Sequence, residues 1–63
     1  MIRENRIKKN WTQEQLAEKA DISWRQIQRI EKNETETRVQ TLRKLVRVLD
    51  IPEEEVIKFL KAD

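Results

Sequence analysis

Cysteine, histidine, tyrosine and glycine are all missing from this 63-residue chain. Without cysteine there are no disulfides or thiolate metal sites, and nothing indicates an oxidising compartment. Without histidine there is no imidazole general base, and without glycine no Gly-rich phosphate loop. Carboxylates are plentiful, but PEEE (residues 52–55) is better explained as the acidic first turn of a helix, where negative charge favours the dipole. The inventory predicts a protein that is not an enzyme and uses no metal or cofactor.

Long apolar stretches are missing as well. No run approaches the ~18 residues of a membrane span, and the opening MIRENR lacks the apolar centre of a signal peptide. We therefore expect a cytoplasmic protein without membrane association. A chain of this length suffices for one domain, residues 1–63, with a single small core that buries only about 60% of the unfolded surface.

Charged residues are abundant but nearly balanced, with a formal net charge of +2. Residues 1–33 carry eight Lys and Arg against five Asp and Glu, a net +3. Residues 34–63 carry six against seven, a net −1. The asymmetry is mild and indicates a polyanionic partner only weakly.

The starts of helices are clearly marked. TQEQ (12–15), SWRQ (23–26) and TRVQ (37–40) each place Ser or Thr three residues before Gln, the pattern of a reciprocal capping box. Pro52 suits the first turn of a further helix, where its missing N–H costs nothing. With the opening segment, the sequence predicts an all-α fold of five helices at about 2–9, 12–20, 23–32, 38–49 and 52–61.

The ends of helices are marked by Asn and Asp, since the chain has no glycine. After glycine, these residues tolerate the left-handed conformation that commonly ends a helix. Asn10, Asp21, Asn33 and Asp50 stand at the four junctions, which predicts a left-handed cap at each. Helical spacing then predicts the following core: Ile2, Ile7, Leu16, Ala17, Ala20, Ile22, Ile27, Ile30, Val39, Leu42, Leu45, Val46, Leu49, Ile51, Val56 and Leu60.

The segment 21–31, DISWRQIQRIE, raises a question about its outer face. As a helix from Ser23 it turns Ile27 and Ile30 to one side. The residues Trp24, Arg25, Gln28, Arg29 and Lys32 then cover an arc of about 140° on the other side. Arg and Lys are ordinary on such a face, but a large exposed aromatic is less expected.

The sequence resembles the lambda repressor–Cro (XRE) helix-turn-helix family of DNA-binding regulators. The resemblance lies in TQEQLAEKADISWRQIQRIEKN (12–33) and TLRKLVRVLDIP (41–52), and it covers nearly the whole chain, from residue 2 to about 60. It implies a compact five-helix, lambda-repressor-like domain whose helix-turn-helix is formed by the second and third helices. Ala17 and Ala20 are small, as a steep crossing of two helices requires.

The resemblance implies roles for several residues. The third helix would enter the major groove, where Arg suits guanine, Gln suits adenine and an apolar side chain suits the thymine methyl group. The residues at base-reading positions are Trp24, Arg25, Gln28 and Arg29. The candidates for phosphate contact are Gln13, Ser23, Lys32, Arg38, Arg43 and Lys44, with Ser23 primarily a helix cap. Arg6 and Glu31 match a partly buried ion pair.

One stretch departs from the family pattern. The loop NETETR (33–38) carries Glu34 and Glu36 where many relatives are basic and touch the DNA backbone. Either these acids point away from DNA, or the loop reduces affinity for the backbone.

The leading hypothesis is a sequence-specific regulator of transcription, a repressor that binds a pseudo-palindromic operator in double-stranded DNA as a homodimer. Ile57 and Phe59 are candidates for the dimer interface, although Phe59 could instead fold into the core. The competing hypothesis is a protein-interaction module of the same fold, an antitoxin or co-regulator, with Trp24 as its anchor. No small-molecule ligand is indicated.

Overall fold

The computed structural model describes residues 1–61, and this part of the chain is all-helical. The predicted all-α class is confirmed, and each expected helix is present within two residues of its expected bounds. A short 3-10 helix, η1, was not expected. The elements are α1 (Ile2–Lys8), α2 (Gln13–Ala20), α3 (Trp24–Lys32), η1 (Glu34–Glu36), α4 (Val39–Leu49) and α5 (Glu53–Lys61).

Two of the three predicted capping boxes are confirmed. At α2, the Gln15 amide N–H donates to Thr12 Oγ1 (3.1 Å) and the Thr12 N–H donates back to Gln15 Oε1 (2.8 Å). Ser23 and Gln26 exchange the same two bonds at the start of α3, each 3.2 Å long. These caps fix where both helices of the helix-turn-helix begin.

The third capping box, at Thr37, is wrong. The Thr37 N–H closes η1 by donating to the Glu34 carbonyl, so Thr37 belongs to the end of that turn. Arg38 is therefore the residue before α4, and its side chain makes no capping hydrogen bond. The Thr37 hydroxyl oxygen is buried without a hydrogen-bond partner among the described residues.

Three of the four predicted left-handed caps are confirmed, at Asn10 (φ 58°), Asp21 (φ 55°) and Asp50 (φ 53°). In each case the next residue donates its N–H to a carbonyl five residues earlier, for example Ile22 to Ala17 at 2.9 Å. This is the Schellman pattern, with Asn or Asp in place of glycine. The prediction for Asn33 is wrong (φ −147°), because η1 follows α3 directly and leaves no room for a left-handed residue.

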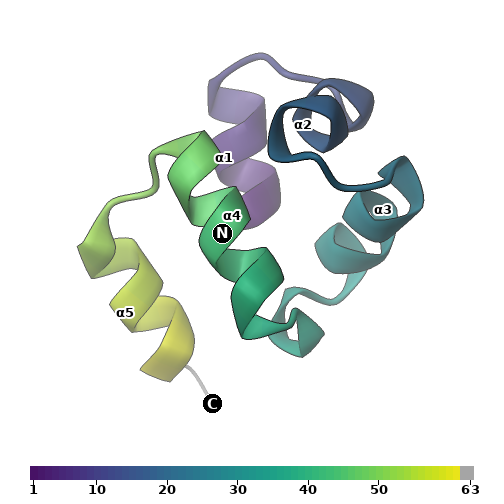
Figure 1. The fold of residues 1–63 in the computed structure, drawn as a ribbon. Helices are drawn as coiled ribbons and strands as arrows, with labels where there is room; N and C mark the ends of the chain where they lie inside the picture. The colour runs from purple at the N-terminus through teal and green to yellow at the C-terminus, as the bar shows by residue number, and fades with distance from the viewer. Residues whose placement is uncertain (62–63) are drawn as a thin grey trace.

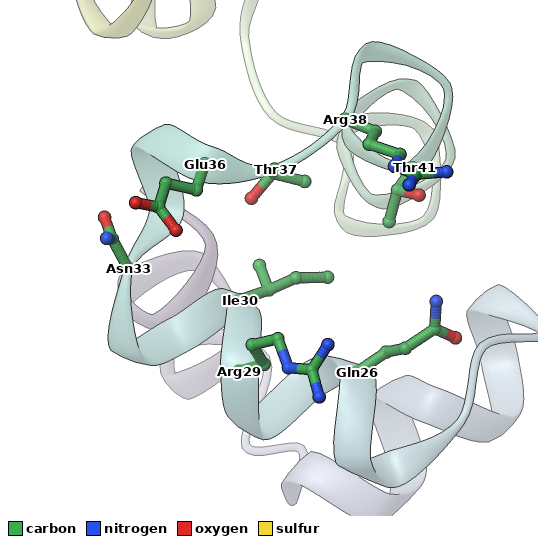
Figure 2. A pocket seen from close by; sticks show the side chains of 8 residues that line it. All are labelled: Gln26, Arg29, Ile30, Asn33, Glu36, Thr37, Arg38 and Thr41. Carbon is green, nitrogen blue, oxygen red and sulfur yellow. The ribbon is translucent and has the colours of Figure 1, made fainter.

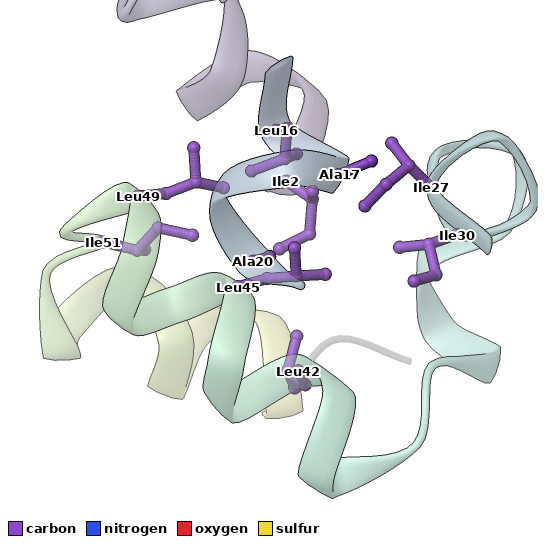
Figure 3. Close-up of a cluster of buried hydrophobic side chains, with 10 residues drawn as sticks. All are labelled: Ile2, Leu16, Ala17, Ala20, Ile27, Ile30, Leu42, Leu45, Leu49 and Ile51. Carbon is purple, nitrogen blue, oxygen red and sulfur yellow. The ribbon is translucent and has the colours of Figure 1, made fainter. Parts of the chain in front are cut away.

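The core lies where α1, α2 and α3 surround one face of α4 (Figures 1 and 3). Most predicted core residues are in or against it. Ile7, Val39 and Leu60 are corrections, since each is more than half exposed. The buried residues are Ile2, Asn5, Leu16, Ala17, Ala20, Ile27, Ile30, Leu42, Leu45, Leu49 and Ile51.

Helical phase explains two of these errors, and position along the helix explains the third. The inner face of α1 holds Ile2 and Asn5, so Ile7 turns away from the core. Phe59, three residues after Val56, packs against the core, and Leu60 is rotated about 100° further round. Val39 is the first residue of α4, at the end farthest from the Leu45–Leu49 part of the core.

Helix α5 lies along the side of α4 opposite α3 (Figure 1). A buried polar contact ties it to α1, since Asn5 Nδ2 donates to Glu55 Oε1 (2.9 Å) and to the Met1 carbonyl (2.7 Å). Buried polar groups are normally hydrogen-bonded in this way. Among residues 1–61, no helix combines the length and the apolar character that a membrane crossing requires.

Candidate nucleic-acid interface

The outer side of α3 carries a polar and aromatic surface, which we call the base-reading face after the role predicted from the sequence: Trp24, Arg25, Gln28 and Arg29. All four are exposed, while Ile27 and Ile30 on the opposite side of the helix are buried. Trp24 is 47% exposed, a high value for a tryptophan. The structure therefore places these residues together on one accessible surface.

The turn between α2 and α3 holds this face at a fixed angle to α2. Ala17 and Ala20 are buried at the crossing, and their small side chains allow the two helices to approach closely. Asp21 adopts the left-handed conformation that the turn requires, and Ser23 caps α3 two residues later. The chain thus has helix-turn-helix geometry in α2 and α3.

The structure also brings Arg6 and Glu31 together. Arg6 Nε lies 2.7 Å from Glu31 Oε2, and Arg6 Nη2 donates to Glu31 Oε1 at 2.9 Å. The third nitrogen, Nη1, donates to the Trp11 carbonyl at 2.7 Å. The Glu31 side chain is only 4% exposed, and its hydrogen bond raises the pKa of the Arg6 guanidinium above the ordinary value. This bidentate pair ties the end of α3 to α1 and to the start of α2.

Gln13 occupies the space between this pair and the base-reading face. Its Nε2 donates to Glu31 Oε1 at 3.2 Å, and its Oε1 accepts the indole N–H of Trp24 at 3.3 Å. The sequence predicted Gln13 only as a phosphate contact. No spacing rule links residues 13, 24 and 31, which meet because α2 crosses α3, so the sequence alone gave no signal for this connection.

The other predicted phosphate contacts are spread over two sides of the molecule. Arg38 lies at the start of α4 and, with Arg29, lines a pocket of about 190 Å³ between α3 and α4 (Figure 2). Lys32 and Lys44 are exposed, and the Ser23 hydroxyl is engaged in its cap. Arg43 instead lines a groove between α4 and α5, so the structure does not group it with the base-reading face.

The two glutamates of the loop 33–38 lie in different environments. Glu34 turns inward and accepts hydrogen bonds from the Ile2 and Arg3 N–H groups (3.1 and 3.3 Å) and the Met1 amine (2.8 Å), so it caps α1 from a distance. Burial disfavours the charge on that amine, but hydrogen bonds to Glu34 and Glu4 hold its pKa above the ordinary value. Glu36 lines the pocket beside Arg38. One acid thus points away, and one stays near the predicted interface.

The groove between α4 and α5, which we call the α4–α5 groove, has a volume of about 630 Å³. Ile57 is exposed on α5 but does not line this groove, whereas Phe59 packs against the core. The structure therefore separates the two residues that the sequence grouped as a dimer interface. The lining residues are Val39, Leu42, Arg43, Val46, Arg47, Asp50, Ile51, Val56 and Leu60.

Comparison with protein families gives a match to the family model described as Helix-turn-helix, over residues 2–56. This range includes α1 to α4 and the start of α5. No curated protein and no solved structure matches the chain.

Proposed function

Because the chain belongs to the lambda repressor–Cro (XRE) type of helix-turn-helix DNA-binding family, we propose that it is a cytoplasmic transcriptional repressor that binds a pseudo-palindromic operator as a homodimer. The proposal concerns the specificity, the repressor role and the assembly, which go beyond DNA binding itself. The specificity rests on the outer side of α3, and the assembly rests on the α4–α5 groove.

The base-reading face is the observation that carries the proposal. Arg25 and Arg29 stand one helical turn apart, an unfavourable pair of like charges in an isolated helix. No carboxylate in residues 1–61 lies within ion-pair distance of either guanidinium. An anionic partner with hydrogen-bond acceptors explains the pair better than solvent does. In the major groove, Arg25 and Arg29 suit guanine O6 and N7, and Gln28 suits adenine.

Contacts with the DNA backbone would flank this face. Helix α4 begins without a side-chain cap, so its first N–H groups and Arg38 together favour a phosphate. Gln13, at the first position of α2, has a second amide hydrogen that its two hydrogen bonds leave available. Ser23, Lys32 and Lys44 are further candidates for backbone contacts. These contacts would orient α3 without specifying sequence.

A homodimer is proposed because one small domain touches few base pairs. Discrimination of ~1–3 kcal/mol per base pair requires several contacted pairs, and two-fold symmetry doubles that number. The α4–α5 groove is the surface best suited to self-association, since Leu60 lines it while exposed, and Ile57 is exposed on the same helix. The lining of the groove carries Arg43, Arg47 and Asp50, and Glu53 and Glu54 are exposed at the start of α5. Such a surface is self-complementary in charge, as an isologous interface requires.

Selection of binding sites from random duplexes, followed by a salt series, tests this function. We expect a selected site with two symmetric half-sites and an affinity that falls steeply with salt. Arg29→Ala should cost ~1–3 kcal/mol and relax preference at one position per half-site. Loss of a lysine or arginine that touches only phosphate would instead weaken binding to all sequences alike and flatten the salt slope.

The alternative function, a protein-interaction module, is favoured by the apolar α4–α5 groove and by the exposed Trp24. Large exposed apolar patches commonly mark protein interfaces. If no sequence is enriched, and if Arg25→Ala and Arg29→Ala bind every duplex as the parent does, the alternative replaces the repressor hypothesis.

A further inference from the structure

We propose that Gln13 is a positioning residue that turns the indole N–H of Trp24 away from DNA, so that Trp24 reads the C5-methyl group of a thymine through its carbon surface alone. The inference rests on the proposed function and deepens it at one residue of the base-reading face. It starts from two hydrogen bonds, Gln13 Nε2 to Glu31 Oε1 (3.2 Å) and Trp24 Nε1 to Gln13 Oε1 (3.3 Å).

The direction of these hydrogen bonds is set by chemistry. Glu31 is buried, and both of its carboxylate oxygens accept from the Arg6 guanidinium, so it presents an acceptor to Gln13. The Gln13 amide must therefore present its nitrogen to Glu31, and its oxygen faces the other way. That oxygen needs a donor. The indole nitrogen of Trp24 is a donor that never accepts, so the two side chains match in polarity.

Few other residues could replace Gln13 in this arrangement. A glutamate has no hydrogen to donate and would bring a second negative charge to Glu31. A lysine has nothing with which to accept the indole N–H, and methionine lacks a donor and is only a weak acceptor. Asparagine has the right polarity but is one methylene shorter. The relay thus depends on the amide of Gln13, and it links a buried ion pair to the exposed face of α3.

The hydrogen bond to Gln13 determines which part of the Trp24 side chain can contact DNA. The indole N–H is the only polar group of its side chain, and it is engaged by Gln13. What remains available at 47% exposure is carbon surface. In the major groove, the base feature that suits an apolar surface is the methyl group of thymine, whereas the other edges present donors and acceptors. Cytosine methylated at C5 offers the same group.

The first experiment observes the relay in the free protein. The chain has two tryptophans, so a ¹⁵N–¹H spectrum shows two indole resonances, those of Trp11 and Trp24. Gln13→Met should shift the Trp24 indole proton upfield and speed its exchange with solvent. The Trp11 indole should stay in place. Gln40→Met, the same substitution at an exposed position of α4, is the matched control and should move neither resonance.

The second experiment replaces each thymine of the selected operator by deoxyuridine, which removes only the methyl group. For the parent protein we expect one position per half-site at which the exchange weakens binding about fourfold, the effect of one buried methyl group. Gln13→Met should reduce this ratio towards one, because the released ring loses its fixed orientation. Gln40→Met should keep the parent's ratio.

The outcomes separate the inference from the function on which it rests. A Trp24 resonance that is unchanged in Gln13→Met overturns the inference and leaves the proposed repressor intact. A uniform loss of affinity for thymine and deoxyuridine operators, with the ratio between them kept at the parent's value, also overturns it, because Gln13 is then a phosphate contact only. If the parent binds no duplex, the proposed function fails and takes the methyl contact with it, while the resonances still decide whether Gln13 holds Trp24.

Discussion

At the residue scale, Glu31 joins the stability of the fold to the surface that would meet DNA. Its two carboxylate oxygens accept from the Arg6 guanidinium, and one of them also accepts from Gln13. A buried carboxylate costs free energy unless it is paired and hydrogen-bonded, and here three donors meet that need. The pair orients α3 relative to α1 more than it adds net stability, because desolvation offsets much of the attraction.

Glu31→Ala should destabilise the fold more than Glu18→Ala. The first change leaves the Arg6 guanidinium without its partner in a partly buried position, at a cost of roughly 1–3 kcal/mol. The second removes a carboxylate from an exposed position of α2, where substitutions have little effect. Thermal unfolding of the two variants beside the parent measures the difference. Melting temperatures within a degree of each other would contradict the structural role of the pair.

Individual contacts between distant residues were the hardest to predict from the sequence. Arg6 and Glu31 were paired only through the family resemblance, since nothing in their 25-residue separation indicates a contact. The sequence leaves open whether Glu34 points towards DNA or away from it, and in the structure Glu34 caps α1, 32 residues earlier in the chain. Such a contact depends on how η1 packs beside α1, and local patterns contain no information about that packing.

At the scale of the elements, prediction succeeded where the deciding hydrogen bonds are local. The capping boxes at Thr12 and Ser23 and the left-handed caps at Asp21 and Asp50 each involve residues within six positions of one another. The error at Thr37 arose because the neighbouring element η1 was not predicted. Its pattern matched a capping box, but η1 uses the Thr37 N–H first and moves the start of α4 by one residue.

Arg38 stands at the uncapped start of α4, where its substitution should change the stability of the fold and the affinity for DNA in opposite directions. Arg38→Ser should raise the melting temperature by the equivalent of about 0.5–2 kcal/mol, because serine can accept from the first turn of α4. The same change should weaken DNA binding and flatten the salt slope by about one unit per copy, because a phosphate contact is lost.

Arg38→Ala is the matched control, since it removes the same charge without supplying a cap. It should weaken DNA binding as much as Arg38→Ser does while leaving the melting temperature near the parent's. Unfolding curves and a salt series on both variants provide the two measurements. Equal melting temperatures for the serine and alanine variants would show that α4 gains nothing from a cap.

At the scale of the whole molecule, the sequence predicted that a fifth helix exists but assigned one of its core residues wrongly. Helical spacing placed Leu60 in the core beside Val56 and left Phe59 open between the core and a dimer interface, whereas in the structure Phe59 packs against the core and Leu60 is exposed. The choice depends on how α5 lies against α4, where the contact between Asn5 and Glu55 holds it. Leu60 and Ile57 are left exposed on α5, the helix that lies on the side of α4 opposite α3 (Figure 1).

That placement constrains how two copies could bind one operator. Half-site centres about one helical turn apart, ~34–36 Å, require each α3 to lie ~17–18 Å from the two-fold axis. The molecule measures 28 × 21 × 17 Å, and α3 and α5 lie on opposite sides of α4. An axis beside α5 is compatible with a separation of this size, because α3 then lies on the far side of the molecule from the axis, whereas an axis beside α3 would bring the two base-reading faces together.

Ile57→Asp should therefore weaken operator binding by at least about tenfold, because burial of an isoleucine side chain is worth ~1.5–3 kcal/mol and a charge would replace it in both copies. Ile7→Asp makes the same change at another exposed isoleucine, on α1, and should leave the affinity near the parent's. Sedimentation of each protein with a two-half-site duplex counts the chains bound. We expect two chains for the parent and for Ile7→Asp, and one for Ile57→Asp at the same concentration. If the parent itself binds as one chain on a site without a repeated half-site, the homodimer is refuted, and the α4–α5 groove must serve a different partner.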